Sequence, residues 1–121
     1  MKDNKYDLEE RLIDFAIIIF DIVDGLPVSR LGHYMAGQLV RSGCSPALNY
    51  GEAQSAESRN DFIHKMKVIL KELRESLISI KIIERKKLHD SEMVLKAKDE
   101  CNQLVAIFVK SIETSKKNNI K

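Results

Sequence analysis

Apolar residues recur at steps of three or four positions in four separate segments of the chain. In the first segment Leu8, Leu12, Phe15, Ile19, Ile22 and Leu26 follow this spacing. An α-helix turns once every 3.6 residues, so the pattern places these side chains on one stripe of a helix. The same spacing recurs at Leu31, Met35 and Leu39, at Phe62, Met66, Ile69, Leu73, Leu77 and Ile80, and at Val94, Ala97, Cys101, Leu104, Phe108 and Ile112. The sequence therefore predicts four amphipathic helices around one core.

Residues that start and stop helices bound these segments. Gly25 and Pro27 are expected to end the first helix, Ser29 to cap the second, and Ser58 to cap the third, with Asp61 completing a variant of the capping box. The predicted helices cover about residues 6–25, 30–56 with a kink near 43–46, 59–86 and 91–115, followed by a polar tail that should fray. Short connections favour an all-α fold, an antiparallel up-and-down four-helix bundle formed by residues 1–121 as a single domain.

The second helix contains a stretch of small residues, SGCSPALNYGEAQSAES, at positions 42–58. Ser45 can act as an N-cap and Pro46 as a first helical position, with Gly43 closing the turn before them. We therefore expect the second helix to be kinked near Pro46 and to resume after the kink. The small side chains would let another helix approach closely.

Asn49 continues the core-facing phase of this helix, so we expect its side chain to point towards the core. A buried amide needs hydrogen-bond partners. The candidates are Glu52, a backbone carbonyl at the kink and a group on a neighbouring helix. The stretch as a whole is interpreted as a tightly packed helix with a polar pin.

Composition limits the class of protein. The chain has 121 residues, of which 44% are hydrophobic and 31% charged, with only 5 glycines and 2 prolines. Its first residues are polar and acidic, unlike a secretory signal, and the longest apolar run, 15–20, is far too short to span a membrane. We expect a cytoplasmic protein without a membrane segment. Cys44 and Cys101 lack metal-ligand spacing and are interpreted as reduced thiols, with Cys101 in the core.

A second set of apolar residues lies opposite the core stripes of the first and third helices. Burial of apolar surface stabilises a protein by about 25 cal/mol per Å². Leaving these side chains in water would therefore forgo roughly several kcal/mol of stabilisation. We therefore expect the chain to form a homo-oligomer through them. The candidate interface residues are Ile13, Ile17 and Phe20 in the first helix, and His64, Val68, Ile78 and Ile82 in the third.

The sequence offers little for catalysis. A di-iron carboxylate bundle needs two inward Glu-x-x-His pairs, and only Asp61-x-x-His64 resembles one, on the outer side of its helix. No glycine-rich phosphate motif occurs, and neither cysteine has a convincing base among His33, His64 and His89. We predict that the protein is not an enzyme and that it needs no cofactor.

Charge is unevenly distributed along the chain. Residues 1–29 carry three basic and seven acidic side chains, a net −4, whereas residues 61–87 carry eight and four, a net +4. The basic positions suggest a nucleic-acid surface, but acidic residues interrupt them and no aromatic residues lie between them for base stacking, so a solvated helix is the other interpretation. The candidate nucleic-acid residues are Lys65, Lys67, Lys71, Lys81, Arg85, Lys86 and Lys87, with Arg74 adding to them.

Residues 38–88 resemble a known family. The stretch contains Arg41-Ser42, a small-residue segment from Ser45 to Asn49, Glu52-Ala53, Ser58, Asp61-Phe62 and Lys71-Glu72. This order is similar to that of the bacterial four-helix-bundle family encoded in intervening sequences of large-subunit (23S) ribosomal RNA genes. The match covers about half of the chain, and the rest agrees in helix pattern. The resemblance marks Arg41, Ser45, Asn49, Glu52, Asp61 and Phe62 as family motif residues.

The resemblance implies a bundle that assembles into a ring, a pentamer, with no known enzymatic activity. A related branch of the fold is the accessory variability protein of diversity-generating retroelements, in which a basic pentamer binds reverse transcriptase and nucleic acid. The present chain differs in its near-neutral net charge of +2.

The sequence thus predicts a non-enzymatic, homo-oligomeric binding or scaffolding protein whose partners are other copies of itself and, as a further candidate, nucleic acid or a nucleic-acid enzyme. An RNA- or DNA-binding ring acting through the third helix is the first alternative. A metal-dependent bundle enzyme is the second.

Overall fold

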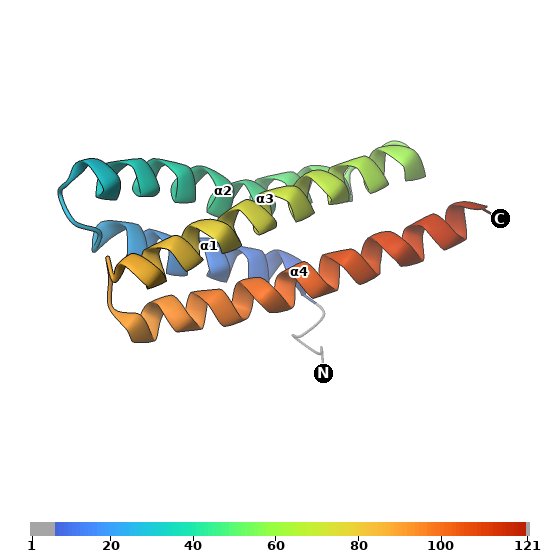
Figure 1. The fold of residues 1–121 in the computed structure, drawn as a ribbon. Helices are drawn as coiled ribbons and strands as arrows, with labels where there is room; N and C mark the ends of the chain where they lie inside the picture. Colours follow the sequence, from blue (N-terminus) through green and yellow to red (C-terminus); the bar gives the residue numbers. More distant parts are fainter. Residues whose placement is uncertain (1–6, 121) are drawn as a thin grey trace.

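The four-helix architecture is present in the computed structural model, which describes residues 7–120 (Figure 1). Within these residues the helices are α1 (Leu8–Asp24), α2 (Arg30–Gln54), α3 (Arg59–Lys86) and α4 (Ser91–Ile120). Each helix packs beside the next one in the chain, and α1 also contacts α4. The predicted all-α four-helix bundle is therefore confirmed.

Side-chain caps explain where the helices begin. Ser29 Oγ accepts a hydrogen bond from the Gly32 N–H at 3.0 Å, and Ser58 Oγ accepts one from the Asp61 N–H at 3.0 Å. Each cap satisfies a backbone donor that has no partner inside the helix. The predicted capping role of both serines is confirmed. Lys87 ends α3 in the left-handed conformation, with φ of 55°.

The last helix is longer than the sequence suggested. It continues to Ile120, whereas we predicted an end near residue 115 and a frayed tail. Neither glycine nor proline occurs between residues 91 and 120, and the exposed Lys116 and Lys117 are good helix formers, so nothing in this segment terminates the hydrogen-bond ladder. In the other direction, α2 ends at Gln54, two residues before its predicted end. The predicted start of the first helix at residue 6 lies outside the described residues.

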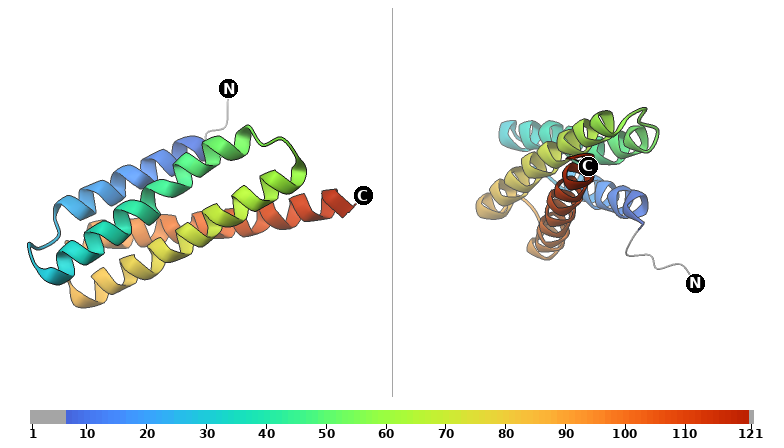
Figure 2. Two further views of the ribbon diagram at one scale, coloured as in Figure 1. Left: turned by 90° about the horizontal axis from the view of Figure 1, so that it is seen from above. Right: turned by 90° about the vertical axis from the view of Figure 1, so that its right-hand side faces the viewer.

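The helix α2 runs through the position of the predicted kink. It is continuous from Arg30 to Gln54 (Figure 2), and the buried Pro46 lies inside it. Ser45 is therefore not an N-cap, and its hydroxyl instead accepts a hydrogen bond from the Asn49 side chain at 2.7 Å. Because proline has no N–H, the helical bond from residue 46 to the Ser42 carbonyl is missing, and the remaining bonds keep the turn helical.

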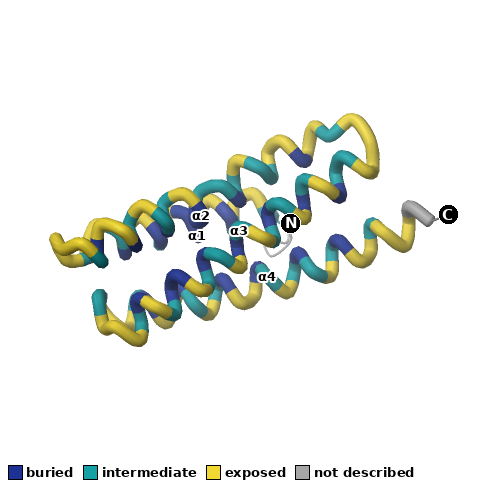
Figure 3. The backbone as a smooth tube through the Cα atoms, turned by 45° about the horizontal axis from the view of Figure 1, so that its top comes forward, coloured by how far each residue is buried: buried dark blue, intermediate teal, exposed yellow. Residues whose placement is uncertain are grey.

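The core runs along the inner stripes of all four helices (Figure 3). All six predicted stripe residues of α4 are buried. In α3 the prediction was wrong at two positions, because Ile63 and Ser76 are buried while Phe62 and Leu77 are only half-buried. A small side chain fits at position 76 because it meets Ser42 of α2 directly.

Gly43 brings α2 close to α1. A Cβ atom at this position would lie 2.9 Å from both the Cγ1 and the Cγ2 atoms of Ile19, which is fully buried. Such a distance is well below van der Waals contact, so the two helices could not pack this closely around any larger residue. The expectation that small residues permit close helix approach is borne out here. None of the helices formed by the described residues combines the length and low polarity needed to cross a bilayer.

We predict that Gly43→Ala lowers the free energy of unfolding by about 1–3 kcal/mol, since the added methyl group overpacks the contact with Ile19. Gly37→Ala and Gly51→Ala are matched controls in the same helix, because an added Cβ meets nothing within 4 Å at either position. These two variants should be more stable by about 0.5–1 kcal/mol, since alanine is a better helix former. Urea denaturation at one fixed protein concentration measures all three. Equal changes at the three glycines would contradict the close packing at Gly43.

Candidate functional site

The outer face of α1 carries exposed apolar side chains. Ile13, Ile17 and Phe20 are 38%, 52% and 45% exposed, as the sequence pattern indicated. The same helix contains five acidic residues and a single basic one, a net charge of −4; these are Glu9, Glu10, Asp14, Asp21, Asp24 and Arg11. This surface is therefore both apolar and strongly acidic.

The outer face of α3 has the opposite charge. Ile78 and Ile82 are 57% and 40% exposed, His64 is exposed, and Val68 is half-buried. The helix carries eight basic and four acidic side chains, a net +4. Both α1 and α3 pack against α2 and α4, so they occupy diagonal corners of the bundle. Their outer faces consequently point to opposite sides of the molecule.

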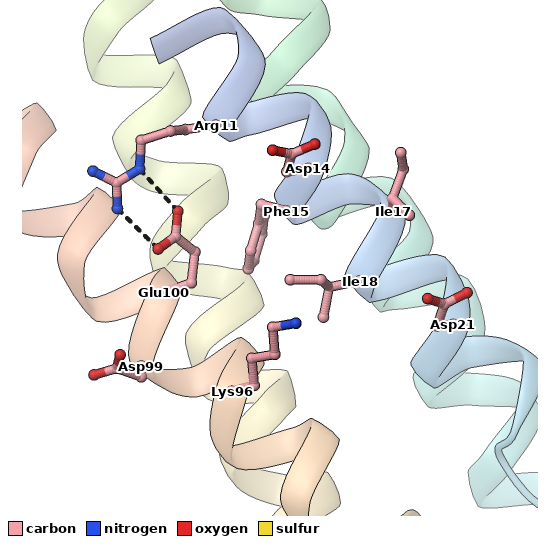
Figure 4. A pocket seen from close by; sticks show the side chains of 9 residues that line it. All are labelled: Arg11, Asp14, Phe15, Ile17, Ile18, Asp21, Lys96, Asp99 and Glu100. Atoms are coloured by element: carbon pink, nitrogen blue, oxygen red, sulfur yellow. Dashed lines mark hydrogen bonds and ion pairs between the residues drawn. The ribbon is translucent and has the colours of Figure 1, made fainter. Parts of the chain in front are cut away.

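A groove lies between α1 and α4 (Figure 4). It encloses about 690 Å³, because α1 packs less extensively against α4 than against α2. In Figure 4 the Arg11 guanidinium meets Glu100 through two hydrogen bonds, of 2.8 and 3.0 Å, and the Lys96 side chain extends from α4 towards α1. The groove is lined by Arg11, Asp14, Phe15, Ile17, Ile18, Asp21, Lys96, Asp99 and Glu100.

The charge in this groove is predominantly negative. The hydrogen bond to Glu100 raises the pKa of Arg11, and this pair neutralises itself. Three further carboxylates, those of Asp14, Asp21 and Asp99, then face one ammonium group, that of Lys96. The groove is therefore suited to a partner that brings basic side chains.

The basic residues of α3 do not form one cluster. Lys65 is bound to Glu52 of α2, with Nζ and Oε1 2.7 Å apart. Lys67, Lys71 and Arg74 instead lie together on the outer face, around a hollow that Ile78 also lines. The remaining candidates, Lys81, Arg85, Lys86 and Lys87, follow towards the end of the helix, where Lys81 is half-buried and the other three are exposed.

Two of the residues that carry the family resemblance, Arg41 and Glu52, form ion pairs across the contact between α2 and α3. The Arg41 guanidinium bridges Glu72 and Glu75 at 2.9 and 2.6 Å, and the hydrogen bond to Glu75 is the main cause of its raised pKa. About three helical turns further along α2, the Glu52 and Lys65 pair joins the same helices again. The motif residues Asp61 and Phe62 belong to the first turn of α3, where Phe62 packs against the core. The motif thus has a structural role in joining α2 to α3.

Asn49 forms its hydrogen bonds within α2, to one of the three partners that the sequence left open. Its Nδ2 atom donates to the Ser45 carbonyl at 3.0 Å and to the Ser45 hydroxyl at 2.7 Å, both within α2. The side chain is half-buried, and of the three proposed partners only the backbone carbonyl near Pro46 is used. A buried polar contact between α2 and α3 is formed instead by Ser42 and Ser76, whose oxygen atoms lie 2.9 Å apart.

The thiols and histidines form no reactive group. Cys101 is buried, its thiol donates to the Leu73 carbonyl at 3.2 Å, and burial raises its pKa to about 12. A thiol that stays protonated at neutral pH is a poor nucleophile. Both cysteines are free, Cys44 is half-buried, and its pKa is raised by burial. Among residues 7–120, no three His, Cys, Asp or Glu side chains come together as a metal site.

None of the ion pairs between helices in the described residues was predicted from the sequence, and two of them lie outside the contact between α2 and α3. Arg11 with Glu100 joins α1 to α4, and Lys98 with Glu84, at 2.9 Å, joins α4 to α3. Long-range pairs of this kind leave no periodic signal. The exposed Leu95 of α4 could have been identified, because it lies beside the stripe residue Val94 and outside the core spacing.

A known structure shares this fold. A protein of unknown function from the S23 ribosomal protein family of Bacteroides thetaiotaomicron superposes with a TM-score of 0.79 and is 26% identical in sequence. The similarity covers 86% of the present chain and 96% of the other. No protein-family model and no curated protein matches the chain. The chain is therefore similar, in fold and over nearly its whole length, to a protein assigned to a ribosomal protein family.

We predict that the hydroxyl groups of Ser42 and Ser76 stabilise the bundle as a pair. Ser42→Ala and Ser76→Ala should each lower the free energy of unfolding by about 1 kcal/mol or more, because each leaves a buried hydroxyl without its partner. The double variant should lose less than the sum of the two, since it leaves neither hydroxyl behind. Urea unfolding of the four proteins forms a double-mutant cycle. Strictly additive losses would show that the two serines do not interact.

Proposed function

We propose that this protein is a non-enzymatic homo-oligomer, a ring that works as a binding or scaffolding module. The observation that carries this proposal is the exposure of large apolar side chains on two opposite faces, represented by Ile17 on α1 and Ile78 on α3. Contiguous apolar residues of this kind mark interaction surfaces in proteins.

The placement of the two faces favours a ring over a dimer. A two-fold dimer uses one surface twice, so it would cover the outer face of α1 or that of α3 and leave the other in water. A head-to-tail contact between the two faces covers both on every copy, and it closes into a ring when the rotation between neighbours is right. The number of five chains comes from the family resemblance.

The same resemblance supplies the biological setting of the proposal. We place the chain with the bundles encoded in intervening sequences of ribosomal RNA genes, and more distantly with the accessory proteins of diversity-generating retroelements. The motif from Arg41 to Phe62 and the similarity to a protein of the S23 ribosomal protein family support this placement.

Assembly is tested by light scattering after size exclusion. The wild-type protein should have about five times the chain mass of 13.8 kDa. Ile17→Glu and Ile78→Glu should each shift the mass towards one chain while far-UV circular dichroism stays helical, since both side chains are exposed in the single bundle. Val28→Glu is the control, because Val28 is an exposed apolar residue in the turn between α1 and α2, away from both faces. A wild-type mass of one chain would overturn the proposal.

A second candidate function is binding of RNA by the outer face of α3. The observation that favours it is the grouping of Lys67, Lys71 and Arg74, for which the described part of the chain provides no ion-pair partner. Unpaired cations on one face are available for phosphate groups as long as no second copy covers that face, so this candidate is an alternative to the head-to-tail ring.

We predict for this candidate that a structured RNA hairpin binds with an affinity that falls steeply between about 50 and about 200 mM salt. Lys67→Gln with Lys71→Gln should reduce the slope of log affinity against log salt by about 2, because two phosphate contacts are lost. Lys110→Gln with Lys116→Gln removes the same charge from exposed positions of α4 and should leave the slope unchanged. Fluorescence anisotropy measures both. Lack of binding at the lowest salt would eliminate the RNA candidate.

A further inference from the structure

We infer that the groove between α1 and α4 of one copy receives the outer face of α3 of a second copy of this chain, an inference that rests on the proposed oligomer. The interface is then formed by an acidic surface with an apolar centre on one subunit and a basic surface with an apolar centre on the next. The two surfaces are different, so the contact is heterologous.

Net charge selects this pairing among the possible ones. The α1 helix carries −4 and the α3 helix +4. An interface between two α1 faces, or between two α3 faces, would bring like charges together across a surface that also has to bury isoleucine. Like-charge contacts oppose such association, whereas an α1 face against an α3 face places each charge opposite its counterpart.

The groove lacks the positive charge that α3 of a second copy supplies. Asp14, Asp21 and Asp99 line it without a basic partner in the described residues, apart from the single Lys96. In Figure 4 Asp14 and Asp21 lie along α1 on either side of Ile17 and Ile18. An incoming helix would therefore find an apolar centre with carboxylates at both ends.

The spacing of these groups on α1 is matched on α3. Ile17 has Asp14 three residues before it and Asp21 four residues after it, while Ile78 has Arg74 four residues before it and Lys81 three residues after it. In both helices the two charges are seven residues apart, which is about 10.5 Å along the axis. One ion pair can thus form at each end of a contact between Ile17 and Ile78.

The direction of the helices allows this register to repeat. In an up-and-down bundle α1 and α3 run the same way (Figure 1). When neighbouring subunits are related by rotation about an axis along the bundle, α1 of one and α3 of the next are parallel. Asp14, Ile17 and Asp21 of one subunit then face Arg74, Ile78 and Lys81 of the next, and the paired positions are offset by at most one residue. Every subunit uses both surfaces.

Charge exchange tests the pairing. Asp14→Lys with Asp21→Lys reverses the α1 face, and Arg74→Glu with Lys81→Glu reverses the α3 face. Each double variant should weaken assembly by about 100-fold in the concentration at which half of the protein dissociates, because like charges then meet at every interface. The variant that carries all four substitutions should assemble again, since opposite charges face each other in the reversed sense. Light scattering over a dilution series measures the three proteins beside the wild type.

The control is Lys110→Glu with Glu113→Lys, which exchanges charges at exposed positions of α4 outside both surfaces and should leave assembly unchanged. If the wild type assembles but neither double variant weakens it, or if the fourfold variant fails to recover, the pairing is overturned while the proposed oligomer stands. A wild type that stays monomeric overturns both. If a double variant loses its helical circular dichroism, a neutral variant replaces it, either Asp14→Asn with Asp21→Asn or Arg74→Gln with Lys81→Gln. Each neutral variant should weaken assembly by about tenfold.

Discussion

The close contact of α2 with both of its neighbours is the constraint on which the bundle depends. At adjacent positions of one helix, Gly43 meets Ile19 of α1 and Ser42 meets Ser76 of α3. Both contacts need a small residue, because neither place has room for a longer side chain. They draw α1 and α3 against opposite sides of α2, and this arrangement turns the outer faces of the two helices away from each other.

Arg41 and Glu52, two of the residues that carry the family resemblance, support the same contact. Arg41 precedes the two small residues and bridges two glutamates of α3, while Glu52 pairs with Lys65 nearer the turn. Exposed ion pairs contribute little to stability, so their value lies mainly in fixing the register of α3 on α2. That register determines where Arg74, Ile78 and Lys81 stand on the surface, and it therefore connects a structural motif to the surface we propose for assembly.

Much of the fold followed from the sequence, and the failures have physical causes. The stripe of α4 was predicted at every position, because apolar periodicity depends only on helix geometry. In α3 the sequence predicted Leu77 in the core, whereas Ser76 is the buried residue. The contact with Ser42 decides which of the two faces inward. For Asn49 the sequence left Glu52, a backbone carbonyl near Pro46 and a neighbouring helix open as partners. The carbonyl is the one used, because a half-buried amide beside Ser45 finds a local acceptor first. Of the candidate site, the exposed rows were identified and the groove was not.

The sequence by itself determined the four helices, their inner stripes, the apolar residues left over on α1 and α3, and the opposite charges of those two helices. All of these are local properties, set by residues within a few turns of one another. Only the tertiary structure decided that α1 and α3 stand at diagonal corners, that a groove opens between α1 and α4, and that Asp14 and Asp21 line it. Those features depend on which helices pack together, and packing joins residues far apart in the chain through side-chain shapes that periodicity does not contain.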